Sequence, residues 1–188
     1  MYTWLLFNIH SINFLYAVAG LSVLGCTLVL LYDYFCNWQD FFTRYVSPYV
    51  WSVIILTSIG GTLTTLLYSE VFGFIPCSLC WLQRVALYPQ TMLSILGYKM
   101  KDTTYFPVYG LALSAFGLLV AVYQYIYQAL PAEMLESGFV PCLADGSADC
   151  SKKVIEVFGF VTFPLLSAIM FSFLIVLYLH VRKANNRQ

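Results

Sequence analysis

Charged residues are scarce in this chain: lysine, arginine, aspartate and glutamate make up only 10% of its 188 residues, and nine basic residues balance nine acidic ones. Soluble domains carry about 25% charged residues, so the composition excludes an ordinary soluble domain. No basic cluster is large enough to follow a phosphate backbone, which argues against binding to nucleic acid. His10 and His180 are the only histidines and lie far from any cysteine pair in the sequence, so no metal relay is indicated.

Hydrophobic residues, in contrast, make up 61% of the chain. A bilayer is spanned by about 20 consecutive, predominantly apolar residues in a helix. Runs of about this length recur along the sequence and predict an all-α membrane protein with five transmembrane spans, at about residues 12–32, 50–68, 81–98, 106–127 and 157–181.

The third predicted span is the least apolar of the five and contains Gln83, Arg84, Pro89 and Gln90. Polar groups and a proline are tolerated inside a membrane where neighbouring helices or water satisfy the freed hydrogen-bonding groups. We therefore expect this helix to lie at the centre of the bundle.

Basic residues gather beyond the ends of two predicted spans, namely Lys99, Lys101, Arg182, Lys183 and Arg187. The positive-inside rule places such segments in the cytoplasm. The connectors that carry the cysteine pairs then lie outside the cytoplasm, as does the N-terminus, while the connector at 33–48 is cytoplasmic.

The six cysteines fall into two unlike groups. Cys26 and Cys36 stand in or beside the first apolar run, where a free cysteine behaves as a small buried hydrophobic residue, and we assign them no chemistry. The other four stand beside polar, turn-like sequence as two close pairs, Cys77/Cys80 and Cys142/Cys150. Outside the cytoplasm, disulfides form and persist.

The Cys77–Cys80 pair is a poor structural crosslink. Its disulfide would close a very short loop, and short loops give the smallest stabilisation. Both residues stand at the predicted start of a helix, where the helix dipole and the Cys-x-x-Cys spacing favour a thiolate. Cys142 and Cys150 enclose seven residues and could form a structural disulfide on their own.

Arg84 follows Cys80 by four residues and Cys77 by seven, so the three side chains share one helical face. A guanidinium one turn inside the bilayer is costly unless it reaches the interface or has a partner. Arg84 is thus either an interfacial arginine or a cation that stabilises a thiolate and the oxyanion of a reducible ligand. A disulfide at the bilayer surface needs an electron partner in the membrane, and a lipid-soluble quinone meets that need.

The sequence Cys77-Ser-Leu-Cys80-Trp-Leu-Gln-Arg84, with the later pair Cys142 and Cys150, resembles the DsbB/BdbC family of disulfide bond formation proteins. The resemblance covers a four-helix redox core at about residues 46–181. It leaves residues 1–45 as an extra N-terminal transmembrane helix with a cytoplasmic connector, and 182–188 as a basic cytoplasmic tail. It implies a multi-pass protein of the bacterial cytoplasmic (inner) membrane, with both redox pairs on the extracytoplasmic face.

The resemblance also implies an enzyme, a quinone-dependent protein-disulfide oxidoreductase. A reduced thioredoxin-fold partner, a DsbA/BdbD-like thiol oxidase, would attack Cys142, and the released Cys150 would attack Cys77. The Cys80 thiolate would contact ubiquinone or menaquinone, and Arg84 would stabilise the charged states. Closing the Cys77–Cys80 disulfide would pass two electrons to the quinone. Gln83 stands where some members have glutamate, and we assign it no acid–base role.

Other interpretations of the four paired cysteines remain open. They could form structural disulfides in a protein that is not an enzyme, or a four-thiolate zinc site, although the wide second spacing and an oxidising compartment disfavour zinc. A CcdA-like thiol electron carrier would need cysteines inside its helices that are reachable from both sides. A vitamin K epoxide reductase-like protein shares the chemistry but orders its paired cysteines differently.

Overall fold

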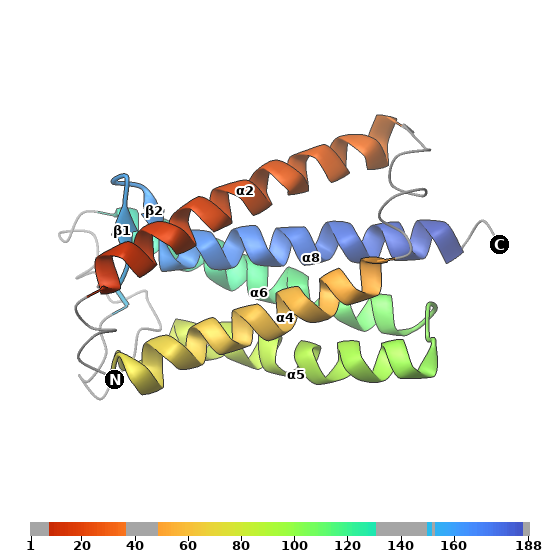
Figure 1. Cartoon of the computed structure of the whole chain (residues 1–188), viewed down its shortest axis with the longest axis horizontal. Coiled ribbons are helices and arrows are strands. Elements are labelled where there is room, and N and C mark those ends of the chain that lie inside the picture. Colours follow the sequence, from red (N-terminus) through yellow and green to blue (C-terminus); the bar gives the residue numbers. More distant parts are fainter. Residues whose placement is uncertain (1–7, 37–48, 131–149, 152, 186–188) are drawn as a thin grey trace.

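The computed structural model describes residues 8–36, 49–130, 150–151 and 153–185, and the statements below refer to these ranges. Within them the chain forms long helices and one short hairpin (Figure 1). The helices are α2 (Ile9–Cys36), α4 (Val50–Leu66), α5 (Ser78–Met100), α6 (Phe106–Ala129) and α8 (Phe163–Asn185), and α4 continues into one π-helical turn, η3 (Leu67–Val71).

The prediction of an all-α membrane protein is confirmed. Four helical segments are long and apolar enough to cross a membrane: α2, α4 with η3, α6 and α8. α5 has 23 residues. At 1.5 Å per residue it is about 35 Å long, enough for a hydrocarbon core of about 30 Å. α5 is more polar than the other four helices. Its assignment as a transmembrane span, the third of the five in chain order, stays a prediction.

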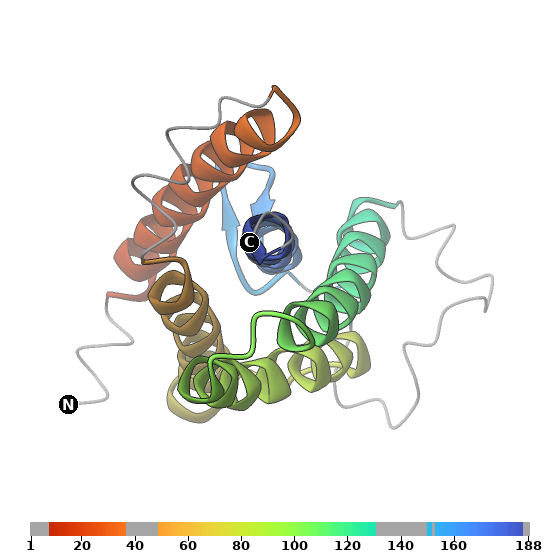
Figure 2. The same ribbon diagram turned by 90° about the vertical axis from the view of Figure 1, so that its right-hand side faces the viewer.

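α8 forms the centre of the bundle. Figure 2 shows it surrounded by an open arc of α2, α4, α5 and α6, and it packs directly against α6, α2 and α4. Its side chains fill the core, with Phe171, Leu174, Leu177 and Tyr178 fully buried. The prediction that the third span lies at the centre is therefore wrong.

The polar residues of α5 explain this difference. They find partners on the two helices on which α5 packs, α4 and α6, and the Oε1 of Gln90 also accepts a hydrogen bond of 3.3 Å from the Tyr178 hydroxyl on α8. Gln90 donates a hydrogen bond of 3.1 Å from its Nε2 to the Oγ of Ser114 on α6. The Thr91 and Thr62 hydroxyls lie 2.9 Å apart between α5 and α4. The buried polar groups of α5 thus find hydrogen-bond partners on neighbouring helices without α5 taking the central position.

Small residues on α6 allow α8 to approach closely. A Cβ atom at Gly110 would collide with the ring of Tyr178, and one at Gly117 would collide with the ring of Phe171. Close packing over small residues is a common basis of helix association in lipid, where water does not drive helices together.

A hairpin separates the long connector from α8. Strand β1 (Glu156–Val157) pairs antiparallel with β2 (Val161–Thr162). Phe158 and Gly159 form its turn with φ values of 56° and 77°, a left-handed conformation that no helix contains. The predicted start of the last span at 157 is therefore wrong, and α8 begins at Phe163, with Pro164 in the first turn, where its missing N–H costs no helical hydrogen bond.

The two ends of the bundle differ in chemistry. The start of α5, the end of α6, the hairpin and the start of α8 lie at one end (Figure 1). The turn between α5 and α6 and the end of α8 lie at the opposite end. Lys99 lies in the last turn of α5 and Lys101 caps its C-terminus, and Arg182 and Lys183 belong to the last turn of α8.

Candidate redox site

Cys77 caps the N-terminus of α5. Its Sγ accepts a hydrogen bond of 3.3 Å from the backbone N–H of Cys80. A capping side chain of this kind satisfies one of the N–H groups that the first turn of a helix leaves without a partner. The predicted placement of both cysteines at a helix start is confirmed, and the positive end of the helix dipole favours a thiolate there.

The sulfurs of Cys77 and Cys80 lie 2.8 Å apart and both residues are free thiols. Both cysteines precede the third predicted span, at about residues 81–98. The hydrogen bond from the Cys77 thiol lowers the pKa of Cys80 to about 6, against the effect of burial, and Gln124 and the charge of Arg84 also lower it. The same hydrogen bond, together with burial, raises the pKa of Cys77. Cys80 is therefore the thiolate of the pair.

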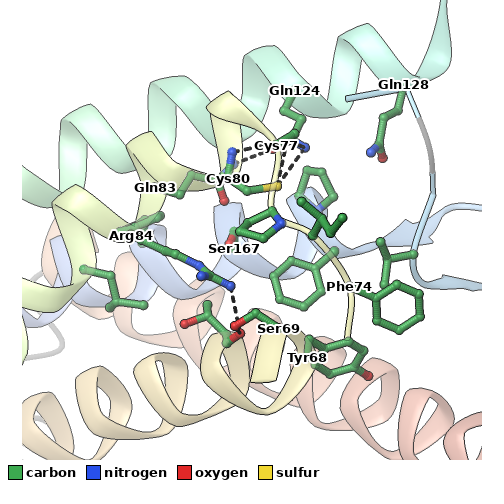
Figure 3. Close-up of a pocket in the computed structure, with 18 of the residues that line it drawn as sticks. Tyr68, Ser69, Phe74, Cys77, Cys80, Gln83, Arg84, Gln124, Gln128 and Ser167 are labelled. Carbon is green, nitrogen blue, oxygen red and sulfur yellow. Dashed lines mark hydrogen bonds between the residues drawn. The ribbon is translucent and has the colours of Figure 1, made fainter. Parts of the chain in front are cut away.

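Gln124 on α6 is a site residue that the sequence analysis missed. Its Nε2 lies 3.4 Å from the Sγ of Cys77 and 3.5 Å from the Sγ of Cys80. Gln83 donates a hydrogen bond of 2.7 Å to the Oε1 of Gln124, so the amide N–H groups of Gln124 turn toward the sulfurs (Figure 3). A glutamine within an apolar span was the available signal, because a buried amide needs partners.

Arg84 points into the bundle and is only 7% exposed, so it is not an interfacial arginine. Its Nη2 donates a hydrogen bond of 2.9 Å to the backbone oxygen of Thr65 on α4, and its guanidinium lies 5.2 Å from the centroid of the Trp81 ring. No carboxylate of the described residues pairs with Arg84. The ion pair that these residues do form joins Lys153 to Glu156. A buried cation without an anion favours a thiolate or an anionic ligand beside it.

The carbonyl that holds Arg84 belongs to the turn in which α4 passes into η3. The backbone oxygen of Thr65 also accepts a hydrogen bond from the Ser69 hydroxyl, at 3.2 Å. The last carbonyls of an α-helix have no partner within the helix, and π-helical turns occur mainly as interruptions at functional sites. The end of α4 thus supplies the acceptor that positions the guanidinium.

Cys150 lies against the Cys-x-x-Cys segment. It is disulfide-bonded, 1% exposed, and packs in one cluster with Cys77, Leu79 and Tyr127. Its Sγ lies 3.9 Å from the Oγ of Ser78. The structure therefore brings together three of the four cysteines predicted to act, although they are far apart in the sequence.

The fourth predicted cysteine, Cys142, lies outside the described residues. Cys26 and Cys36 are free, but they are exposed on α2 rather than buried as expected. α2 presents much of its surface to the surroundings, where an apolar residue contacts lipid in a membrane, so a cysteine fits there as well as in a core.

A cavity of about 250 Å³ opens beside the two sulfurs (Figure 3). Polar side chains converge on it, and apolar side chains such as Phe74, Leu87 and Phe163 form much of the remaining wall. Its polar lining comprises Cys77, Cys80, Gln83, Arg84, Gln124 and Ser167, among others. Apolar pockets with a few convergent polar groups are typical ligand sites. Throughout the described ranges, this cavity included, no three His, Cys, Asp or Glu side chains group as metal ligands would.

Comparison with known proteins identifies relatives of the chain. The family model for disulfide bond formation protein DsbB matches residues 47–181. The SPbeta prophage-derived disulfide bond formation protein B of Bacillus subtilis (strain 168) is 38% identical over 130 residues, which are 69% of this chain and 82% of the relative. The disulfide bond formation protein C of the same organism is 32% identical over 126 residues, or 67% of this chain and 84% of the relative.

A probable disulfide formation protein of Coxiella burnetii (strain Dugway 5J108-111) is 35% identical over 141 residues, covering 71% of this chain and 87% of the relative. No solved structure matches the chain significantly. The helical bundle, in which Cys77, Cys80 and Cys150 gather at one end, defines a multi-pass membrane protein of thiol–disulfide chemistry. The chain belongs to the DsbB family of disulfide bond formation proteins, which confirms the resemblance noted in the sequence.

Proposed function

We propose that this protein is a quinone-dependent protein-disulfide oxidoreductase that reoxidises a thioredoxin-fold dithiol partner. The observation that carries the proposal is the position of the Cys80 thiolate. It shares one cavity with Arg84, a buried cation without a carboxylate partner among the described residues. Membership of the family supports disulfide bond formation in a membrane. The quinone as electron acceptor and the thioredoxin-fold partner are the parts that we propose.

The residues of the cavity fit a quinone head group. Such a group is a flat ring with two carbonyl oxygens that take up negative charge on reduction. Phe74, Leu87 and Phe163 supply apolar walls for the ring, and Arg84 supplies a positive charge for an oxygen. A bound quinone would supply the acceptor for two electrons. Either ubiquinone or menaquinone has this chemistry.

The residues of the chain hold the dithiol ready to give up those electrons. Gln124 donates to the sulfurs, and Arg84 together with the start of α5 stabilises negative charge on Cys80. Cys77, with its raised pKa, retains its proton until the disulfide closes. Formation of the Cys77–Cys80 bond then releases two electrons and one proton. The proton is that of Cys77, because Cys80 reacts as the thiolate, and it passes to the acceptor or to solvent.

Electrons reach this dithiol by thiol–disulfide exchange, in which each step breaks one S–S bond and forms another. A thiolate of the reduced partner attacks Cys142 and releases Cys150. Cys150 attacks Cys77 and releases the Cys80 thiolate. The second thiolate of the partner closes its own disulfide and frees Cys142, which attacks Cys150 and releases Cys77. The free Cys77 and Cys80 and the disulfide-bonded Cys150 correspond to the state after these steps.

The site would face the extracytoplasmic side of a bacterial cytoplasmic membrane. Lys99, Lys101, Arg182 and Lys183 lie at the opposite end of the bundle from the cysteines, and the positive-inside rule assigns such an end to the cytoplasm. The partner would then be a DsbA/BdbD-like thiol oxidase in the oxidising compartment.

Quinone reduction by the full chain tests the proposal. The protein in detergent is mixed with a reduced thioredoxin-fold dithiol protein and with ubiquinone or menaquinone, and quinone absorbance is followed with time. We expect consumption that disappears in Cys80→Ser and Cys142→Ser and persists in the control Cys26→Ser. No consumption of either quinone, or equal loss in all three variants, would contradict the proposed function.

A further inference from the structure

A second, larger cavity of about 830 Å³ lies between α2, α4 and α8. It adjoins the cavity at the thiols, because four residues line both: Thr65, Leu87, Phe163 and Ser167. Figure 2 shows α2 and α4 as neighbours in the arc of helices, both on the same side of α8. The two cavities therefore lie next to each other, with these four residues between them or at their junction.

The second cavity is apolar in spite of its threonines. The hydroxyl of Thr64 donates 2.8 Å to the backbone oxygen of Gly60, and that of Thr65 donates 2.9 Å to the backbone oxygen of Thr62. Hydroxyls bonded within their own helix leave mainly methyl groups for a ligand. Of the described residues that line the cavity, only Glu70 is charged, and it is exposed. The walls thus suit a long hydrocarbon chain.

α2 forms the outer wall of this cavity through Tyr16, Ala19, Gly20 and Val23. This helix lies outside residues 47–181, which match the family model. In the middle of α2, Gly20 lets Leu166 of α8 approach so closely that a Cβ atom there would collide with it, and Ala19 contributes only a methyl group to the cavity wall.

Contacts at both ends hold α2 in place. Near its start, Asn13 accepts a hydrogen bond from the Tyr68 hydroxyl. Near its end, His180 and Lys183 on α8 donate to the backbone oxygens of Leu30 and Tyr34, at 3.0 and 2.8 Å. α2 is thus fixed on the bundle beside the cavity rather than loosely attached to it.

We propose that the second cavity holds the isoprenoid tail of the quinone and that α2 is the outer wall of this tail site. The inference rests on the proposed function, because the head group of the same molecule would occupy the cavity beside Cys80. The adjacency of this cavity to the one at the dithiol, across four shared lining residues, favours a quinone tail over the acyl chain of a phospholipid, whose head group has no partner at the dithiol.

Filling the cavity from α4 tests the proposal. A Cβ atom at Gly60 would meet no atom within 4 Å, so Gly60→Leu can project into the cavity without a collision. Gly25 on α2 is the matched control, because its Cβ would also meet no atom within 4 Å and it lines neither cavity. Both variants replace a helical glycine by leucine, so they change helix propensity equally.

A second pair of variants tests the wall that α2 provides. Ala19→Phe enlarges a side chain that lines the cavity, and Val18→Phe enlarges its exposed neighbour, which lines neither cavity. All four variants are compared with the unaltered protein in the same detergent. The rate of quinone reduction is measured with a long-tailed quinone and with an analogue that has the same ring but no tail.

We expect Gly60→Leu and Ala19→Phe to raise the KM for the long-tailed quinone about tenfold, the loss that follows when one or two methylene groups are no longer buried. Gly60→Leu and Ala19→Phe should both reduce the tail-less analogue at the rate of the unaltered protein. The controls Gly25→Leu and Val18→Phe should match the unaltered protein with both quinones. A normal long-tail KM in Ala19→Phe would overturn the role of α2. Equal losses with both quinones would overturn the tail site.

Loss of co-purified phospholipid in Gly60→Leu, with an unchanged KM for the long-tailed quinone, would also overturn the tail site and indicate an acyl chain. A failure of the proposed function has a different signature, because the unaltered protein would then reduce neither quinone.

Discussion

Gln83 on α5 donates a hydrogen bond of 2.7 Å to the side-chain oxygen of Gln124 on α6, and both side chains are buried. This bond decides which end of the Gln124 amide faces the thiols, because an oxygen that accepts from Gln83 leaves the N–H groups for Cys77 and Cys80. A neutral amide so placed stabilises a thiolate without adding a second charge to the buried site.

Gln124→Leu should raise the pKa of Cys80, because the thiolate loses a hydrogen-bond donor. Hydrogen bonds to charged groups contribute about 1.5–3 kcal/mol, so the midpoint should rise by at least about one pH unit. The measurement is the rate of Cys80 alkylation as a function of pH, read by mass spectrometry. Gln90→Leu is the control, since it removes another buried amide that bonds to Ser114 and should leave the midpoint in place. An equal change in both variants would mean that only packing was altered.

Alkylation of the unaltered protein should itself rise with pH through a midpoint near 6, the lowered pKa of Cys80. Below that pH the thiol is protonated and unreactive, and above it the thiolate is present and the rate approaches a plateau. Cys77 should react later and at higher pH, because its pKa is raised. A common midpoint for both cysteines near the ordinary thiol value of about 8.5 would contradict the assignment of Cys80 as the thiolate.

Arg84→Gln should slow quinone reduction by about a hundredfold, since loss of one group that stabilises developing negative charge commonly costs that much. The exchange between the partner and Cys142 should continue, because it does not use Arg84. Steady-state rates with the quinone, compared with the yield of the mixed disulfide in its absence, separate the two steps. Lys99→Gln removes the same charge from the far end of α5 and should behave as the unaltered protein. Loss of both steps in Arg84→Gln would assign Arg84 a structural role.

Hydropathy predicted the helices well because each helix in this bundle is bounded by polar or turn-forming residues. The exception is residues 157–162, where Val157, Phe158 and Val161 are as apolar as the helix that follows, yet lie in a hairpin. Composition cannot separate the two, since the difference lies in the backbone conformation of Phe158 and Gly159.

The chemistry of the site was predictable where it is local in sequence. Cys77, Cys80 and Arg84 lie within two turns of one helix, so their spacing alone placed them on one face. Gln124 and the carbonyl of Thr65 belong to other helices, and their positions depend on how α6 and α4 are aligned with α5. The central position of α8 likewise depends on which helices pack together rather than on the polarity of any one of them.

Gly117→Val should destabilise the bundle, because the new side chain would collide with the ring of Phe171 at the contact between α6 and α8. Overpacking of a tight core costs about 1–3 kcal/mol, and the free energy of unfolding should fall by that amount. The measurement is equilibrium unfolding in mixed detergent, followed by circular dichroism. Gly25→Val is the control, since it places the same residue in a helix where a Cβ atom meets no neighbour, and any loss common to both reflects helix propensity alone. Equal stability of the two variants would mean that α6 and α8 do not pack as closely as described.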